Sequence, residues 1–260
     1  MGPRGVQTSR LESALHAEGD LKLVGYMMAG HPNRKKSLEV GKRLAASGVA
    51  ALEIGIPFSD PLADGPVIQR AGQAALEHGM NMGAALELAA AVAAEGTPVV
   101  LMSYVNPILA FDPRRFAAEA AQAGVAGVIV PDLPVEESEP VASWLRSASV
   151  DTIFMVAPTT SDDRFATICQ HSSGFVYCVT VTGITGARKD MPEGMKELFA
   201  KVRENTELPV AAGFGISRPE HMKLLRGKAD AAVVGSAIVA EIDRGADPLP
   251  LVKELLKACR

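Results

Sequence analysis

The sequence predicts an α/β fold of the (β/α)8-barrel (TIM-barrel) class, with an extra N-terminal helix. Three observations support this: eight short apolar runs alternate with amphipathic helical patterns, the runs are continuously apolar, and the chain has 260 residues. Continuous apolar strands that alternate with helices indicate a parallel sheet buried on both faces. A barrel of this length is normally one domain, so we expect residues 1–260 to form a single domain.

A first helical pattern at residues 9–18 precedes all of the apolar runs, and we expect residues 1–8 before it to be disordered. The apolar runs cover residues 22–29, 51–56, 98–103, 127–130, 152–156, 175–179, 209–212 and 231–234. The helical patterns that follow them cover residues 35–47, 82–94, 113–123, 136–148, 162–171, 193–205, 218–226 and 236–244. Eight strand–helix units favour a closed barrel over an open sheet.

A dinucleotide-binding fold is the main alternative for such a pattern. It requires a G-x-G-x-x-G motif directly after the first strand, where glycines admit a pyrophosphate. The chain instead reads MAGHP at residues 28–32. The sequence therefore disfavours a doubly wound sheet.

Composition narrows the class of protein further. The net charge of −4 gives no basic footprint for nucleic acid. No segment approaches the roughly 20 apolar residues of a membrane span. The three cysteines, Cys169, Cys178 and Cys259, have no metal-site or disulfide spacing, and no secretory signal precedes the first helix. We therefore expect a cytoplasmic protein with reduced thiols and no metal.

The first candidate for chemistry is Glu53, because barrel active sites lie at the carboxyl ends of the strands. Glu53 interrupts an apolar run near its end, and a buried unpaired charge is unfavourable unless it has a partner or a task. A structural glutamate paired with a core cation is the alternative. No basic residue ends a neighbouring predicted strand, so the functional interpretation is favoured.

An unusual loop at residues 56–66 follows this strand. Three prolines restrict its backbone, and Asp60 and Asp64 flank the sequence PLA between them. Each aspartate alone is ordinary turn chemistry. Together with Glu53, they predict a cluster of three carboxylates above one strand.

The last strands carry glycines at their carboxyl ends. A Gly/Thr-rich loop at residues 180–190 is long enough to be a mobile lid. Gly213 and Gly215 follow the seventh run, and Gly235 and Ser236 follow the eighth. At this place, backbone N–H groups and the start of a helix favour the binding of a phosphate. The alternative is that the glycines serve only to form tight turns.

Other barrel chemistries lack their residues. A Schiff-base enzyme needs a lysine at a strand's carboxyl end, but Lys22 begins its strand. A metal site needs several convergent ligands, and His31, the one histidine at the active face, fits a turn. Acid–base catalysis by carboxylates remains. Apolar residues near the strand ends suit a flat aromatic ring; these are Tyr26, Met102, Met155 and Phe214.

These motifs resemble one family over nearly the whole chain, from about residue 9 to 258. The run LEIGIPFSDPLADGPVIQ at residues 52–69 resembles the signature of the tryptophan synthase α chain. It is joined by PDLPVEES at 131–138, TGITG at 182–186, GFGIS at 213–217 and GSAIV at 235–239.

The resemblance implies cleavage of indole-3-glycerol phosphate to indole and glyceraldehyde 3-phosphate, a retro-aldol lyase reaction of tryptophan biosynthesis. It implies that Glu53 is the acid–base catalyst and that Asp64 holds the indole N–H. The substrate pocket implied by the pattern and the resemblance comprises Tyr26, Met102, Tyr104, Met155, Tyr177, Thr185 and Phe214. The implied phosphate site comprises Gly186, Gly213, Gly215, Gly235 and Ser236.

The resemblance also implies a partner, the tryptophan synthase β chain, in an αββα heterotetramer. Pro57, Asp60 and Asp132 match the positions that the family uses at this contact. No cofactor is expected in this chain, because pyridoxal phosphate belongs to the β chain. A free-standing lyase and a non-catalytic barrel that activates a β chain are the alternatives, and intact Glu53 and Asp64 argue against the second.

Three positions depart from the usual family pattern. His31 replaces a common aspartate, Met28 a frequent threonine, and Ala74 a frequent arginine. We expect them to change pairing details without changing the reaction.

Overall fold

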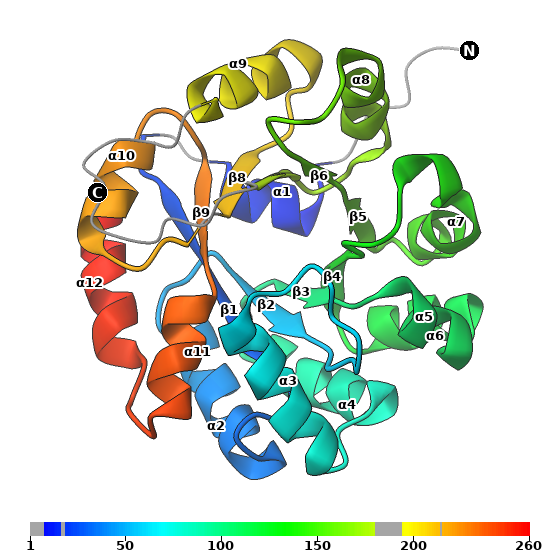
Figure 1. Cartoon of the computed structure of the whole chain (residues 1–260), viewed down its shortest axis with the longest axis vertical. Coiled ribbons are helices and arrows are strands. Elements are labelled where there is room, and N and C mark those ends of the chain that lie inside the picture. The colour runs from blue at the N-terminus through cyan, green and yellow to red at the C-terminus, as the bar shows by residue number, and fades with distance from the viewer. Residues whose placement is uncertain (1–7, 17–18, 180–193, 214) are drawn as a thin grey trace.

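A computed structural model describes residues 8–16, 19–179, 194–213 and 215–260. The strands stand at the centre and the larger helices surround them (Figure 1). The strands are β1 (Lys22–Met28), β2 (Ala51–Gly55), β3 (Val99–Met102), β4 (Val125–Ile129), β5 (Asp151–Ile153), β6 (Met155–Val156), β7 (Val176–Val179), β8 (Val210–Gly213) and β9 (Ala231–Val234). The helices are α1 (Arg10–Leu15), α2 (Arg34–Ala45), α3 (Pro66–Glu77), α4 (Met82–Ala93), α5 (Val105–Phe111), α6 (Pro113–Gln122), α7 (Glu139–Ser147), α8 (Asp162–His171), α9 (Met195–Asn205), α10 (Pro219–Leu225), α11 (Ser236–Asp243) and α12 (Leu249–Cys259), with a 3-10 turn, η1 (Val135–Glu137), before α7.

The sheet closes into a barrel through its fifth predicted strand. All paired strands are parallel, in the order β5-β4-β3-β2-β1-β9-β8-β7-β6. The two ends of this order, β5 and β6, are separated by Phe154 alone, so they belong to one crossing of the barrel. The predicted barrel is therefore confirmed, with its fifth run divided into two short strands.

Two apolar clusters fill the fold. One lies between the sheet and the helices, and the other lies inside the barrel. Leu11 and Leu15 of α1 are fully buried in the inner cluster, beside Val24, Ile153 and Phe175. The strands begin at the end of the barrel where α1 lies. Helix α1 therefore closes the base of the barrel and leaves the opposite end open for a site.

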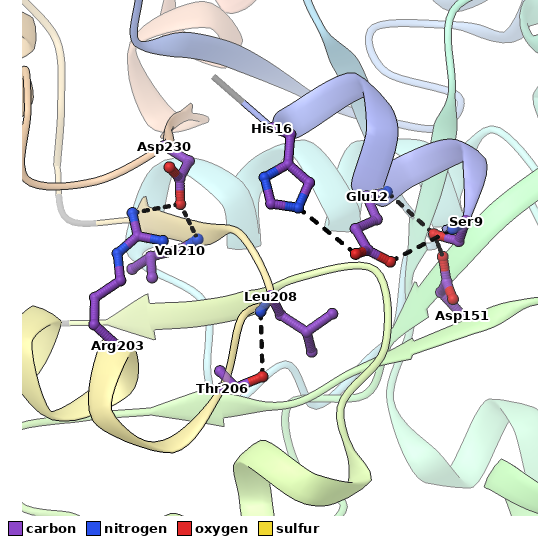
Figure 2. Close-up of polar contacts among 9 residues, drawn as sticks. All are labelled: Ser9, Glu12, His16, Asp151, Arg203, Thr206, Leu208, Val210 and Asp230. Atoms are coloured by element: carbon purple, nitrogen blue, oxygen red, sulfur yellow. Dashed lines mark hydrogen bonds and ion pairs between the residues drawn. The ribbon is translucent and has the colours of Figure 1, made fainter. Parts of the chain in front are cut away.

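Helix α1 begins where its sequence provides a cap. The Ser9 hydroxyl accepts a hydrogen bond from the Glu12 N–H at 3.1 Å, and Glu12 accepts one from the Ser9 N–H at 3.4 Å (Figure 2). This reciprocal capping box fixes the start of the helix. The helix ends at Leu15, which is earlier than predicted.

Three helices were not among the predicted patterns: α3, α5 and α12. None of them has a side-chain hydrogen bond at its N-cap, which is Gly65, Tyr104 and Pro248 respectively. The usual Ser, Thr, Asp or Asn start signal is therefore missing from their sequences. No helix in the described part of the chain is long and apolar enough to cross a membrane.

Candidate active site

Glu53 points into the barrel because of its place in β2. Side chains alternate along a strand, and Leu52 and Ile54 belong to the outer apolar cluster whereas Ala51 belongs to the inner one. Glu53 lies in register with Tyr26 of β1 and is only 2% exposed. Its Oε2 atom has no hydrogen-bond partner among the described residues. Within the described part of the chain, this buried carboxyl is therefore held in an apolar layer without a neutralising cation.

This environment changes the protonation of Glu53. Burial disfavours the charged form and raises the pKa of Glu53 to about 8, and the negative charge of Asp64 acts in the same direction. At neutral pH the carboxyl therefore carries a proton. A protonated carboxyl whose pKa lies near working pH is suited to general acid catalysis.

Asp64 lies on the connection between β2 and α3 and is half-buried. Its N–H donates to the Pro61 carbonyl at 3.1 Å, and its own carbonyl accepts from Gln69 Nε2 of α3 at 2.9 Å. Burial raises the pKa of Asp64 to about 6, and a hydrogen bond from Tyr104 opposes this rise. Near pH 7 Asp64 is ionised while Glu53 is protonated, so two neighbouring carboxyls hold opposite states.

Two tyrosines occupy space that two glycines leave open. A Cβ atom on Gly55 would lie 2.1 Å from Tyr26 Oη, and one on Gly213 would lie 2.4 Å from Tyr177 Oη. Both distances are shorter than any tolerated contact, so larger residues at these positions would displace the rings. Sequence patterns alone do not single out Gly55, although a glycine inside a strand signals a close approach.

The remaining predicted pocket residues surround the same space. The charges of Glu53 and Asp64 both act on Tyr26 and Tyr177, whose buried hydroxyls have raised pKa values chiefly because of desolvation. Met102, Met155 and Tyr177 cover the inner apolar cluster. Tyr104 follows β3 and contacts the loop that carries Asp64. Two further predicted residues, Thr185 and Phe214, lie outside the described residues, as does the predicted lid at 180–190.

The predicted phosphate residues stand at the ends of two adjacent strands. Gly213 ends β8, Gly215 follows with a φ of 58°, and Gly235 is the N-cap of α11, which begins at Ser236. Helix α11 has no side-chain hydrogen bond at its N-cap, so its first N–H groups remain available to an anion. Gly186 lies outside the described residues.

The predicted interface residues differ in their surroundings. Pro57 is buried, whereas Asp60 and Asp132 are exposed. The Asp132 carboxylate also accepts a hydrogen bond from the Val105 N–H at 2.9 Å and so caps α5, a task that the sequence did not reveal. Asp132 and Met155 both line a cavity of about 270 Å³ between the β4–η1 connection and α8.

The departures from the family pattern lie in the packing around β1 and α3. His31 is 5% exposed, and its Nε2 atom lies 3.6 Å from Asp243 Oδ1. Met28 packs on α3, since a Cβ on Gly72 would lie 3.5 Å from its methyl group. The Ala74 carbonyl is 2.7 Å from His78 Nδ1. No three potential ligand side chains in the described ranges are grouped to hold a metal.

Comparisons with known proteins agree with this geometry. The family model described as "Tryptophan synthase alpha chain" matches residues 13–259. The chain belongs to the tryptophan synthase alpha chain family. It is 48% identical over 228 residues to the alpha chain of Carboxydothermus hydrogenoformans, which covers 87% of this chain and 85% of the relative. It is 42% identical to that of Methanopyrus kandleri, over 98% of this chain and 96% of the relative.

Solved structures show the same family fold. Tryptophan synthase from Mycobacterium tuberculosis superposes with a TM-score of 0.92 at 34% identity, covering 98% of this chain and 99% of that one. The alpha chain from Legionella pneumophila superposes with a TM-score of 0.85 at 31% identity, covering 97% and 98%. The tryptophan synthase alpha reaction is the lyase cleavage of indole-3-glycerol phosphate. The alpha chain is the cofactor-free subunit, and pyridoxal phosphate belongs to the beta chain.

Proposed function

We propose that Glu53 carries the proton in this cleavage and that Asp64 holds the substrate. The observation that supports the assignment best is the pairing of a buried, unpartnered, protonated carboxyl with an ionised one beside it. Environments that separate two carboxyls in this way assign them different roles. We further propose that the whole chain acts as one domain.

The reaction needs two proton transfers, and Glu53 carries out both. Glu53 donates its proton to indole C3, which makes the ring carbon a better leaving group, and the bond to the side chain then breaks. The side-chain hydroxyl becomes an aldehyde and returns its proton to the Glu53 carboxylate. Asp64 accepts the indole N–H and stabilises the positive charge that builds on the ring.

The rest of the proposed site binds the two ends of the substrate. The indole ring lies among Tyr26, Tyr104, Tyr177, Met102 and Met155, with Thr185 and Phe214 completing the proposed pocket. The phosphate binds to backbone N–H groups at the ends of β8 and β9 and at the start of α11. These phosphate residues are Gly186, Gly213, Gly215, Gly235 and Ser236.

The proposed partner is a tryptophan synthase β chain, in a cytoplasmic αββα heterotetramer. Pro57, Asp60 and Asp132 form the proposed contact. Two exposed leucines support an interface here: Leu62 on the catalytic loop is 92% exposed, and Leu109 on α5 is 53% exposed. The loop and α5 adjoin through Tyr104, so both leucines stand on neighbouring segments of this face.

Indole release by Glu53→Gln and Asp64→Asn tests the assignment of roles. Both changes keep the side-chain size and remove the acid. We expect Glu53→Gln to lower kcat by about 100- to 10,000-fold, the range of acid–base contributions, and Asp64→Asn to lower it less. Glu77→Gln on the exposed face of α3 is the matched control and should keep the wild-type rate. A near wild-type rate in Glu53→Gln would refute the proposal.

Adding a β chain tests the partner. We expect a complex in size-exclusion chromatography and faster indole release than from this chain alone. Full activity alone with no complex would instead favour the free-standing lyase.

A further inference from the structure

Tyr104 joins the catalytic loop to the fixed frame of the barrel. It follows β3 directly, is the N-cap residue of α5, and is 3% exposed. The next residue is anchored as well, since the Val105 N–H donates to Asp132 Oδ1 at 2.9 Å. The backbone of Tyr104 therefore belongs to the scaffold, whereas its side chain reaches the loop.

The Tyr104 hydroxyl makes two contacts with neighbouring loop residues. Its oxygen accepts a hydrogen bond from the Ala63 N–H at 3.1 Å, which places the hydroxyl beside the next residue, Asp64, where its proton acts to lower the pKa of the Asp64 carboxyl. A phenol has one proton to donate and lone pairs to accept, so this arrangement uses both functions. No other residue type offers both on a rigid ring of this length.

The Tyr104 ring makes a separate, apolar contact with the same loop. The ring centroids of Tyr104 and Phe58 are 5.3 Å apart and their planes are inclined by 33°. The loop is thus held at residues 58 and 63, on both sides of Pro61 and directly before Asp64, by one side chain. The ring contact and the hydroxyl contacts can be removed independently, which makes their effects separable.

We propose that Tyr104 is a positioning residue, which holds the Asp64 carboxylate in the orientation that binds the indole N–H. This inference rests on the proposed role of Asp64. It adds to the pocket role of Tyr104 a distinct action through another residue. The hydroxyl has an electrostatic effect as well as a geometric one, because a hydrogen bond to a carboxylate favours its charged form.

The pH dependence of kcat/KM tests this inference. In Tyr104→Phe the ring contact remains, and burial of Asp64 is no longer opposed by the hydroxyl. We expect the acid limb of the profile to move up by roughly one pH unit, since a bond to a charged group is worth about that much. The rate near pH 6 should fall roughly fivefold and recover towards pH 7.5. In the control Phe58→Leu the hydroxyl remains, and the acid limb should stay in place.

Two results would overturn the inference. One is an acid limb that does not move in Tyr104→Phe. The other is a loss of rate by the same factor at every pH, which a merely structural role would produce. Asp64→Asn separates failure of the inference from failure of the proposed function. If Asp64→Asn keeps the wild-type rate and acid limb, the role of Asp64 fails and the inference fails with it. If Asp64→Asn abolishes the limb while Tyr104→Phe leaves it unmoved, only the inference fails.

Discussion

The carboxyls that the fold shields from solvent have opposite surroundings at the open end of the barrel and at its base. At the open end, Glu53 faces the barrel interior and its Oε2 atom has no partner among the described residues. At the base, Asp151 begins β5 and accepts a hydrogen bond from the Ser9 hydroxyl at 2.6 Å (Figure 2). The Ser173 hydroxyl also lowers the pKa of Asp151. Burial raises the pKa of both acids, but only at Asp151 do hydrogen bonds oppose the rise.

A second carboxyl at the base follows the same rule as Asp151. Asp230 precedes β9 and pairs with Arg203 at 2.6 Å, and it also accepts from the Val210 N–H at 2.7 Å (Figure 2). Where acids serve the fold, their oxygens are satisfied. Keeping Glu53 unsatisfied destabilises the folded chain, and the proposed proton transfer explains why it is retained.

The largest expected difference between the two ends is in catalysis. Glu53→Gln should lower kcat by about 100- to 10,000-fold. Asp151→Asn makes the same chemical change in a partly buried strand acid and should keep kcat within about twofold of wild type, since proton transfer at the open end does not involve it. Steady-state indole release measures both. A large loss of kcat in folded Asp151→Asn would break the comparison.

The pH dependence of stability should also distinguish Glu53. Its pKa in the folded chain, about 8, lies above its ordinary value of 4.5, so the folded state retains a proton that the unfolded state releases. The free energy of unfolding therefore decreases as pH rises between these two values. By pH 7 it has decreased by on the order of 3 kcal/mol. Glu53→Gln removes this slope.

Denaturant unfolding of wild type and Glu53→Gln at pH 5 and pH 8 measures the effect. We expect the variant to gain stability relative to wild type between the two pH values. A constant difference would mean that Glu53 ionises normally in the folded chain.

At the base, removal of a carboxyl should destabilise the fold instead. Asp151→Ala takes the acceptor from the Ser9 and Ser173 hydroxyls and loosens the contact between α1 and β5. We expect a loss of about 1 kcal/mol in the free energy of unfolding, the low end of the effect of leaving a donor unpaired, because both hydroxyls are only partly buried. Urea unfolding at pH 7 measures it. An unchanged stability would show that α1 closes the barrel without this bond.

The smallest effect is expected from the exposed pair beside it. His16 Nε2 lies 3.6 Å from Glu12 Oε1, and the His16 side chain is 50% exposed (Figure 2). Solvent screens such pairs, so His16→Ala should change the free energy of unfolding by less than about 0.5 kcal/mol. A larger loss in the same urea experiment would show that the number of hydrogen-bond partners does not predict how much each contact stabilises the fold.

The sequence predicted the features that depend on local patterns. The barrel followed from eight apolar runs, and Glu53 was visible as an acid within one of them. The fold prediction is confirmed, although the division of the fifth strand at Phe154 was not foreseen. The roles of Glu53 and Asp64 remain predictions.

Contacts between distant residues were not predictable in this way. The hydroxyl of Tyr104 meets the Ala63 N–H across 41 positions of the chain, and the Asp132 cap reaches Val105 across 27. No periodicity encodes such pairs, since the barrel brings them together only when it closes. The fit of Tyr26 over Gly55 is of the same kind.

Direct titration of Glu53 tests the central claim of unsatisfied burial. The chain would be labelled with ¹³C at the glutamate carboxyl carbons, and the Glu53 resonance would be assigned by its absence in Glu53→Gln. Its chemical shift would then be followed from pH 4 to pH 9 by NMR. The account predicts a midpoint near 8, as burial and Asp64 together require. A midpoint near the ordinary value of 4.5 would contradict it.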